Sequence, residues 1–141
     1  MNYQKPIAKS TLQNWHLPMN AKTDQLSDRL LDFAVEIIKI TDALPNTVVE
    51  RHVEGQLIRA GTSSGSNYEE ACGAEPRSDF AHKISIVLKE LNELRFWLRL
   101  IFRTEMLSSD RTEPVLEECQ QLCAIVAKSI LTAKRRRSPN G

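Results

Sequence analysis

Apolar residues recur every three or four positions along most of the chain, which is the spacing of one face of an α-helix. The first such segment starts at Thr23 or Asp24, either of which can cap a helix, and it ends before Pro45. Proline ends the segment because the residue before a proline disfavours helical backbone. The apolar stripe of this first predicted helix consists of Leu26, Leu30, Phe33, Ile37, Ile40 and Leu44.

The next two segments are long. Asn46 can cap a second helix from about residue 46 to 73, where Gly73 suits the C-terminal end. Its apolar face consists of Val49, Val53, Leu57 and Ala60. Ser78 or Asp79 can cap a third helix, which ends near the polar segment RTEMLSSD. The stripe of this helix is the most regular in the chain and consists of Phe80, Ile84, Val87, Leu91, Leu94, Leu98 and Ile101.

A fourth helix is predicted to begin near Thr112, with Pro114 in its first turn, where a missing N–H is tolerated. Its stripe consists of Leu116, Cys119, Cys123, Val126 and Ile130. Four helices joined by short links predict an all-α, up-down-up-down four-helix bundle. We therefore expect an N-terminal arm at residues 1–22, the bundle at 23–134 and a basic, flexible C-terminal tail at 135–141.

Composition excludes few functions. The chain is 41% hydrophobic and 26% charged, which is typical of a globular domain, and its net charge of +1 favours no particular partner. No apolar run approaches the ~18 residues of a membrane span, and the N-terminal segment lacks the apolar region of a signal peptide. A cytoplasmic location without membrane contact is therefore expected. Trp15, in the arm, is expected to dock on a surface of this chain or of a partner.

The segment IRAGTSSGSNYEEACG, residues 58–73, resembles a phosphate-binding loop only in composition. It lacks the lysine of a Walker A loop and the G-x-G-x-x-G order of a dinucleotide fingerprint, and no β-rich run precedes it. Small residues one turn apart allow a neighbouring helix to approach closely. Gly61, Ser64 and Gly65 are therefore predicted to pack against another helix.

Two stretches together resemble a known family. IRAGTSSGSNYEEA followed by SDFAHKISIVLKELNELRFWLRL is similar to the four-helix bundle proteins named after 23S rRNA intervening sequences, over about residues 24–133. The chain departs from the family at Ser64 and Tyr68, where isoleucine is usual, and at Glu69, where alanine is usual. It matches at Arg59, Ser63, Gly65, Asn67, Glu70, Asp79, Phe80, Lys83 and Ile86.

The resemblance implies an all-α bundle that assembles as a ring, commonly a homopentamer. It also implies kinship with accessory proteins of diversity-generating retroelements, which bind a reverse transcriptase and nucleic acid. For most members no biochemical activity is established. The expected function is accordingly a non-enzymatic oligomeric scaffold or adaptor, whose partners are its own copies and RNA or a reverse transcriptase-like protein.

Polar positions of the family pattern predict a structural cluster where the second and third helices meet. Arg59 is expected to pair there with Glu70 or Asp79. Asn67 lies near the core stripe, and a buried asparagine must be hydrogen-bonded, which in bundles often fixes the register. We expect Arg59→Ala to disturb folding or assembly.

Apolar residues outside the main stripe predict an oligomer interface. Ile86, Trp97 and Leu100 lie away from the stripe of the third helix, and Ile38, Leu122, Ile125 and Leu131 do so on other helices. A four-helix monomer hides one stripe per helix, so a second apolar strip indicates a partner. The alternative is a broad core face that covers these residues.

Two groups of basic residues predict a nucleic-acid surface. Arg95, Arg99 and Arg103 recur every four residues on the third helix. The second group is the run of Lys134, Arg135, Arg136 and Arg137. Repeated around a ring, they would produce a concentrated positive field. The alternatives are a solvated helix end, where cations favour the helix dipole, and neutralisation of the arginines by Glu90, Glu93 or Glu105.

No catalytic constellation is evident, because the Glu-x-x-His spacing of di-iron bundles is absent. Cys119 and Cys123 could join Cys72 and His82 around a metal, but both lie on an apolar stripe, where cysteine packs as a small hydrophobe. The three thiols are expected to be reduced, and no metal or other cofactor is predicted. The alternatives to a scaffold are a bundle with a small-molecule or metal site between helices and an oligomer with a purely structural role.

Overall fold

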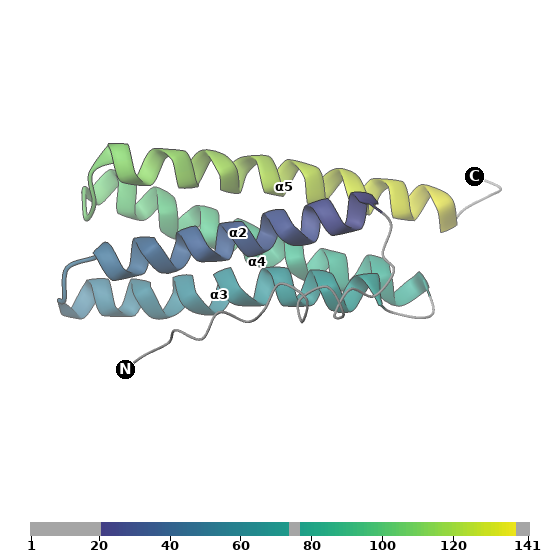
Figure 1. The fold of residues 1–141 in the computed structure, drawn as a ribbon, viewed down its shortest axis with the longest axis horizontal. Helices are drawn as coiled ribbons and strands as arrows, with labels where there is room; N and C mark the ends of the chain where they lie inside the picture. Colours follow the sequence, from purple (N-terminus) through teal and green to yellow (C-terminus); the bar gives the residue numbers. More distant parts are fainter. Residues whose placement is uncertain (1–20, 74–76, 138–141) are drawn as a thin grey trace, which may run out of the picture.

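The computed structural model describes the backbone of residues 21–73 and 77–137, which form four α-helices and no strand. They are α2 (Ala21–Ala43), α3 (Val48–Cys72), α4 (Arg77–Thr104) and α5 (Ser109–Arg137). Successive helices run in opposite directions and lie side by side, so the predicted all-α, up-down-up-down bundle is confirmed (Figure 1). The N-terminal arm up to residue 20, with Trp15, and residues 138–141 lie outside the described residues.

The helix ends differ from the predicted ends by a few residues. Thr47, rather than Asn46, is the N-cap of α3, and its side chain makes no capping hydrogen bond. Asn46 instead accepts a hydrogen bond from Arg51 at 3.1 Å. α5 begins at Ser109, which leaves Pro114 in its second turn, and it continues to Arg137, into the range predicted as tail.

The core lies along the predicted stripes. Its most completely buried side chains come from all four helices, which explains why the period is visible in every segment. Val49 is an exception, because it lies in the first turn of α3 and is 57% exposed. The largest fully buried side chains are Phe33, Leu30, Ile37, Leu57, Ile84, Leu91, Leu94, Leu98, Ile101, Leu122, Val53 and Val87.

α2 and α3 approach closely at one glycine. A Cβ atom at Gly61 would lie 2.8 Å from Cγ2 of Ile37, closer than real Cβ contacts allow. A Cβ atom at Gly65, one turn further, would lie 3.6 Å from Cβ of Leu30, which is an ordinary contact. Ser64 is fully buried, and its hydroxyl donates a hydrogen bond to the carbonyl of Gly61 at 3.2 Å. The tightest fit between these helices is therefore local to Gly61.

The turn between α4 and α5 is short and fixed by backbone hydrogen bonds. Glu105 has a φ of 56°, in the left-handed region. Its N–H bonds to the carbonyl of Phe102 at 3.4 Å, and the N–H of Met106 bonds to the carbonyl of Ile101 at 3.3 Å. These two bonds form a Schellman motif, which satisfies carbonyls at the end of a helix. The half-buried Met106 packs on the core and closes this end of the bundle.

Candidate functional site

A polar seam joins α3 to α4, and we define it as Arg59, Asn67, Glu90 and Glu93. The guanidinium of Arg59 forms an ion pair with the carboxylate of Glu93. One Asn67 amide hydrogen is donated to Oε1 of Glu90, with a nitrogen–oxygen distance of 2.9 Å. The seam therefore couples two levels of α3 to two levels of α4, which fixes their register.

The partner of Arg59 differs from the two predicted partners. Glu70 lies three turns further along α3, about 16 Å away at 1.5 Å per residue, so it cannot meet Arg59. Because α4 is antiparallel, Glu70 faces the start of α4 and pairs with Lys83 at 3.6 Å. Asp79 is exposed in the first turn of α4, where a carboxylate is favourable beside the positive end of the helix dipole.

Among the described residues, Glu90 is the carboxylate of the seam that has an unpaired buried oxygen. Its Oε2 atom is buried and has no hydrogen-bond partner among the described residues. Partial burial raises the pKa of Glu90, while the hydrogen bond from Asn67 and the charge of Arg59 oppose the rise. The hydrogen bond and charge of Glu93 raise the pKa of Arg59, which keeps its guanidinium charged. The seam holds two carboxylates, an amide and a guanidinium, which pair with one another across α3 and α4.

An arginine stripe, defined as Arg95, Arg99 and Arg103, runs along α4. Arg95 is half-buried, whereas Arg99 and Arg103 are exposed. None of the three forms a hydrogen bond or ion pair with another residue that the structure describes. Glu93, which was a candidate to neutralise them, pairs with Arg59 instead. The positive charge of the stripe is therefore not cancelled by direct ion pairs.

The second basic group lies at the other end of the bundle. Lys134 and Arg135 are exposed near the end of α5, while Arg136 and Arg137 are helical but their side chains are not described. α5 starts beside the end of α4, and its 29 residues span about 43 Å. The two basic groups therefore lie far apart within one protomer (Figure 1).

The predicted interface residues are only partly exposed. Ile86 is half-buried, and Trp97 and Leu100 pack against the core. Leu122, which was also placed outside the stripe, is fully buried. The alternative of a broad core face therefore accounts for part of this set.

Ile38 and Leu131, which the sequence also placed outside the main stripes, are exposed, as are several apolar side chains that were not predicted. Leu31, Val35 and Ile38 form a stripe on α2 with exposures of 61%, 43% and 43%. On α4, Phe96 is 57% exposed and stacks edge-on against Trp97, with ring centroids 5.1 Å apart. The sequence interpretation missed Phe96, although its place beside Trp97 was a visible signal. The remaining large exposed apolar residues are Val48, Val49, Ile58, Phe102 and Leu131.

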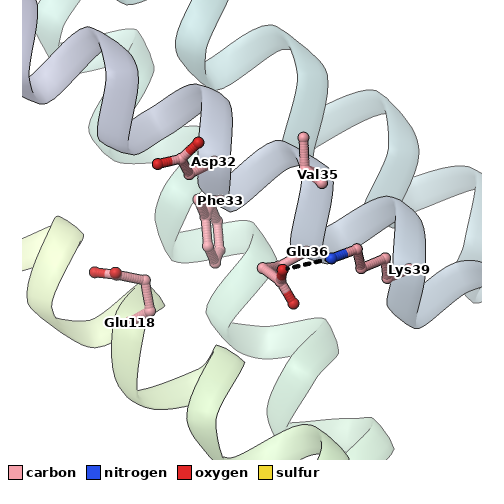
Figure 2. Close-up of a pocket in the computed structure, with 6 residues that line it drawn as sticks. All are labelled: Asp32, Phe33, Val35, Glu36, Lys39 and Glu118. Atoms are coloured by element: carbon pink, nitrogen blue, oxygen red, sulfur yellow. Dashed lines mark hydrogen bonds and ion pairs between the residues drawn. The ribbon is translucent and has the colours of Figure 1, made fainter.

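An open groove of about 410 Å³ lies between α2 and α5, where the two helices pack less extensively than the other neighbours (Figure 2). Its charged groups are largely engaged: Glu36 accepts a hydrogen bond from Lys39 at 3.2 Å, and Glu118 accepts one from Arg29 at 2.9 Å. The lining residues are Asp32, Phe33, Val35, Glu36, Lys39 and Glu118.

The described residues do not assemble the four-ligand metal set. No group of three or more His, Cys, Asp or Glu side chains within them is arranged to hold a metal ion. Cys119 and Cys123 are buried on α5, whereas Cys72 is half-buried on α3 and His82 is exposed on α4. Within the described helices, none has the length and apolar character to cross a membrane.

Comparison with known proteins places the chain in a family. Residues 24–128 match the family described as 23S rRNA-intervening sequence protein. Among solved structures, a protein of unknown function from the S23 ribosomal protein family of Bacteroides thetaiotaomicron VPI-5482 is 35% identical in sequence. The alignment covers 74% of this chain and 97% of that chain, with a TM-score of 0.69. A search of curated proteins found no match. The chain therefore belongs to the 23S rRNA-intervening sequence protein family.

Proposed function

We propose that this protein is a cytoplasmic, non-enzymatic scaffold that assembles as a ring-like homo-oligomer, with five copies as the expected number, and binds RNA or a nucleic-acid enzyme. The observation that carries the proposal is the arginine stripe, whose three guanidinium groups have no ion-pair partner among the described residues. Free guanidinium groups in a row attract phosphate, because each can donate several hydrogen bonds in a fixed geometry.

Assembly is supported by the exposed apolar surface. Leu31, Val35 and Ile38 expose a continuous row on α2, and Phe96 exposes an aromatic ring beside Trp97 on α4. Contiguous apolar surface of this kind marks protein interfaces, and aromatic residues often dominate their binding energy. Repetition of the arginine stripe in each copy of a ring would multiply its field.

The assembly part is tested by light scattering at micromolar concentration. We expect a mass several times the 16.0 kDa of one chain. Phe96→Glu should shift the mass toward that of the monomer, because it places a charge in the aromatic surface, while the exposed control Lys89→Glu should not. A parent protein that remains monomeric would contradict the ring.

The nucleic-acid part is tested by an RNA retention assay in salt from 50 to 200 mM. The double variant Arg99→Gln/Arg103→Gln is compared with Lys89→Gln/Lys128→Gln, which removes the same charge from exposed lysines elsewhere. We expect the arginine variant alone to weaken binding and to lower the salt slope by about two. Absence of retention by the parent at low salt, or equal loss in both variants, would contradict a role for the stripe.

The groove between α2 and α5 favours the alternative of a small-molecule site, because its volume of about 410 Å³ is in the range of ligand pockets. Its openness to solvent and its internally paired charges weigh against this alternative. Co-purified nucleic acid, measured by absorbance at 260 and 280 nm, separates the two functions.

A further inference from the structure

The solvent side of α2 combines apolar and acidic side chains, and we call it the outer face of α2. Its positions are three or four residues apart, so they lie on one side of the helix. All of them are exposed, and Val35 points away from the core (Figure 2). The residues of the outer face are Asp28, Leu31, Asp32, Val35 and Ile38.

Asp28 and Asp32 give this face an uncompensated negative charge. They are one turn apart on α2, and neither forms an ion pair with another residue that the structure describes. Glu36, one turn further, differs because it pairs with Lys39. Like charges one turn apart repel each other, so a cation beside them is favourable. The outer face therefore suits a basic segment that also carries apolar side chains.

The segment that precedes α2 has this composition. Residues 1–20 contain Lys5 and Lys9 but no Asp or Glu, and Trp15 is their largest apolar side chain. They lie outside the described residues, and α2 begins directly after them at Ala21. The charge and the apolar character of the arm are therefore complementary to those of the outer face.

The distances along the chain allow this contact within one protomer. Leu31 follows Ala21 by ten residues, which is about 15 Å along α2. Trp15 precedes Ala21 by six residues, and six extended residues span about 20 Å. Pro18 disfavours helical backbone at Leu17, which favours an extended chain between these points. A chain that turns back at the start of α2 can therefore bring the indole to the apolar row.

We propose that the N-terminal arm, residues 1–20, folds back over the outer face of α2 in the same protomer. Trp15 covers Leu31 and Val35, and Lys9 lies beside the two unpaired aspartates. A tryptophan side chain can bury about 150–250 Å² of surface, which is enough to shield this row from water. The inference is independent of the arginine stripe and of the function proposed for it.

A second copy of the chain is the competing occupant of the outer face. A two-fold contact between two such faces would place Asp28 and Asp32 near the same residues of the other copy, where like charges oppose binding. The arm has the opposite charge and is tethered, so its effective concentration is of millimolar order and weak contacts suffice. The aromatic surface of Phe96 and Trp97 on α4 remains available for assembly.

The first test cross-links the full chain with a water-soluble carbodiimide, which joins an amine to a carboxylate where the two are in contact. Unlabelled and ¹⁵N-labelled protein are mixed in denaturant and refolded together, so peptide mass separates links within one chain from links between copies. We expect Lys9 to be joined to Asp28 or Asp32 within one chain. Absence of links from the arm to α2, or links between copies alone, would overturn the proposal.

The second test follows tryptic cleavage after Lys9 in the native chain, because the rate tracks the undocked population when docking is fast. Cleavage should be slower than in a synthetic peptide of residues 1–20. Leu31→Gln removes apolar contact and should raise the rate in the full chain about tenfold. The matched control is Leu131→Gln on α5, where the leucine is 58% exposed against 61% for Leu31, and it should change the rate by less than about twofold.

A charge variant tests the acidic half of the outer face. Asp28→Asn/Asp32→Asn should raise the cleavage rate about fivefold, as expected for two ion pairs screened by water. Glu113→Gln/Glu117→Gln removes the same charge from two exposed residues one turn apart on α5 and should leave the rate almost unchanged. Circular dichroism checks that each variant is folded.

Three results of the cleavage test would contradict docking of the arm. The first is cleavage of the parent as fast as the free peptide, and the second is equal acceleration in a variant and its matched control. The third is a fall in the mass of Leu31→Gln by light scattering without faster cleavage after Lys9, which would assign the outer face to a second copy.

Discussion

Where α3 faces α2, it presents small residues that fit by shape, and where it faces α4, it presents polar side chains that fit by pairing. The contact of Gly61 with Ile37 is an example of the first kind, and that of Asn67 with Glu90 is an example of the second. Shape is enforced by steric repulsion, which rises steeply over tenths of an ångström. Polar pairing is enforced by hydrogen bonds that water can partly replace. The α2 side should therefore be less tolerant of substitution than the α4 side.

The largest expected effect comes from Gly61→Ala. The new Cβ atom would lie 2.8 Å from Ile37 Cγ2, so the Ile37 side chain or the helix that carries it must shift. Overpacking costs about 1–3 kcal/mol, and the better helix propensity of alanine recovers about 1 kcal/mol. We expect a net loss of up to about 2 kcal/mol in the free energy of unfolding, measured by urea denaturation.

Gly65→Ala is the matched control. Its Cβ atom has room at 3.6 Å from Leu30, so alanine should stabilise the protein by up to about 1 kcal/mol. Ile37→Leu moves the branch away from Gly61 and should recover part of the loss in a double variant with Gly61→Ala. Equal changes in the free energy of unfolding for Gly61→Ala and Gly65→Ala would show that the close contact with Ile37 does not determine the effect.

A smaller effect is expected from Asn67→Ala. It removes the 2.9 Å hydrogen bond to Glu90 and leaves a second oxygen of that carboxylate without a protein partner. We expect a loss of about 1 kcal/mol in urea denaturation. The neighbouring exposed control Ser66→Ala should stay within about 0.5 kcal/mol of the parent. A loss for Asn67→Ala above that for Gly61→Ala would reverse the comparison.

Glu90→Gln tests the same seam by pH. Because the pKa of Glu90 is raised in the folded chain, the native state holds its proton more tightly than the unfolded state. Stability from this group is therefore present at low pH and is lost as pH rises from the ordinary value of about 4.3 through the raised pKa. Glutamine removes that loss, so the variant should be more stable than the parent at pH 7 by a few tenths of a kcal/mol, since water screens this partly exposed group.

The advantage of Glu90→Gln should disappear at pH 4, where Glu90 is protonated in the folded state. Urea denaturation at both pH values measures the difference. An advantage of equal size at pH 4 and pH 7 would mean that packing, and not the charge of Glu90, explains it.

The smallest effect is expected from Arg59→Gln. The side chain of Arg59 is 53% exposed, and exposed ion pairs contribute little because water and salt screen them. Contrary to the expectation from the sequence that Arg59→Ala disturbs folding, the urea midpoint should stay almost unchanged. A large drop in the midpoint would show that this ion pair, despite its exposure, sets the register of α3 and α4.

The apolar period predicted the four helices and most core positions, because burial of one face dominates the choice of residues there. Helix ends were less predictable, since Asn46 and Thr47 are both good caps and only tertiary context decides between them. The polar seam illustrates a different limit. Arg59 and Asn67, its members on α3, could be identified from the sequence. Their partners depend on the axial register of α4 against α3, which no local pattern encodes.

Surface assignments were the least predictable part. Leu122 lies one position from the line of its stripe but is fully buried, because α5 is covered from two sides. Phe96 and Trp97 are adjacent in sequence, yet only the tryptophan packs on the core. A difference of one position turns a side chain by about 100° around a helix, so small shifts in helix packing decide which residue faces water.

The limited packing between α2 and α5 has a consequence for how the chain folds. Every other pair of packed helices in the described bundle is consecutive in sequence, so each closes over a short loop and forms quickly. Packing α2 against α5 instead requires most of the chain to be ordered first, and the few contacts between them offset little of that entropy cost. We therefore expect the packing of the three consecutive helix pairs to set the folding rate. The first and last helices should pack together only after the folding transition state.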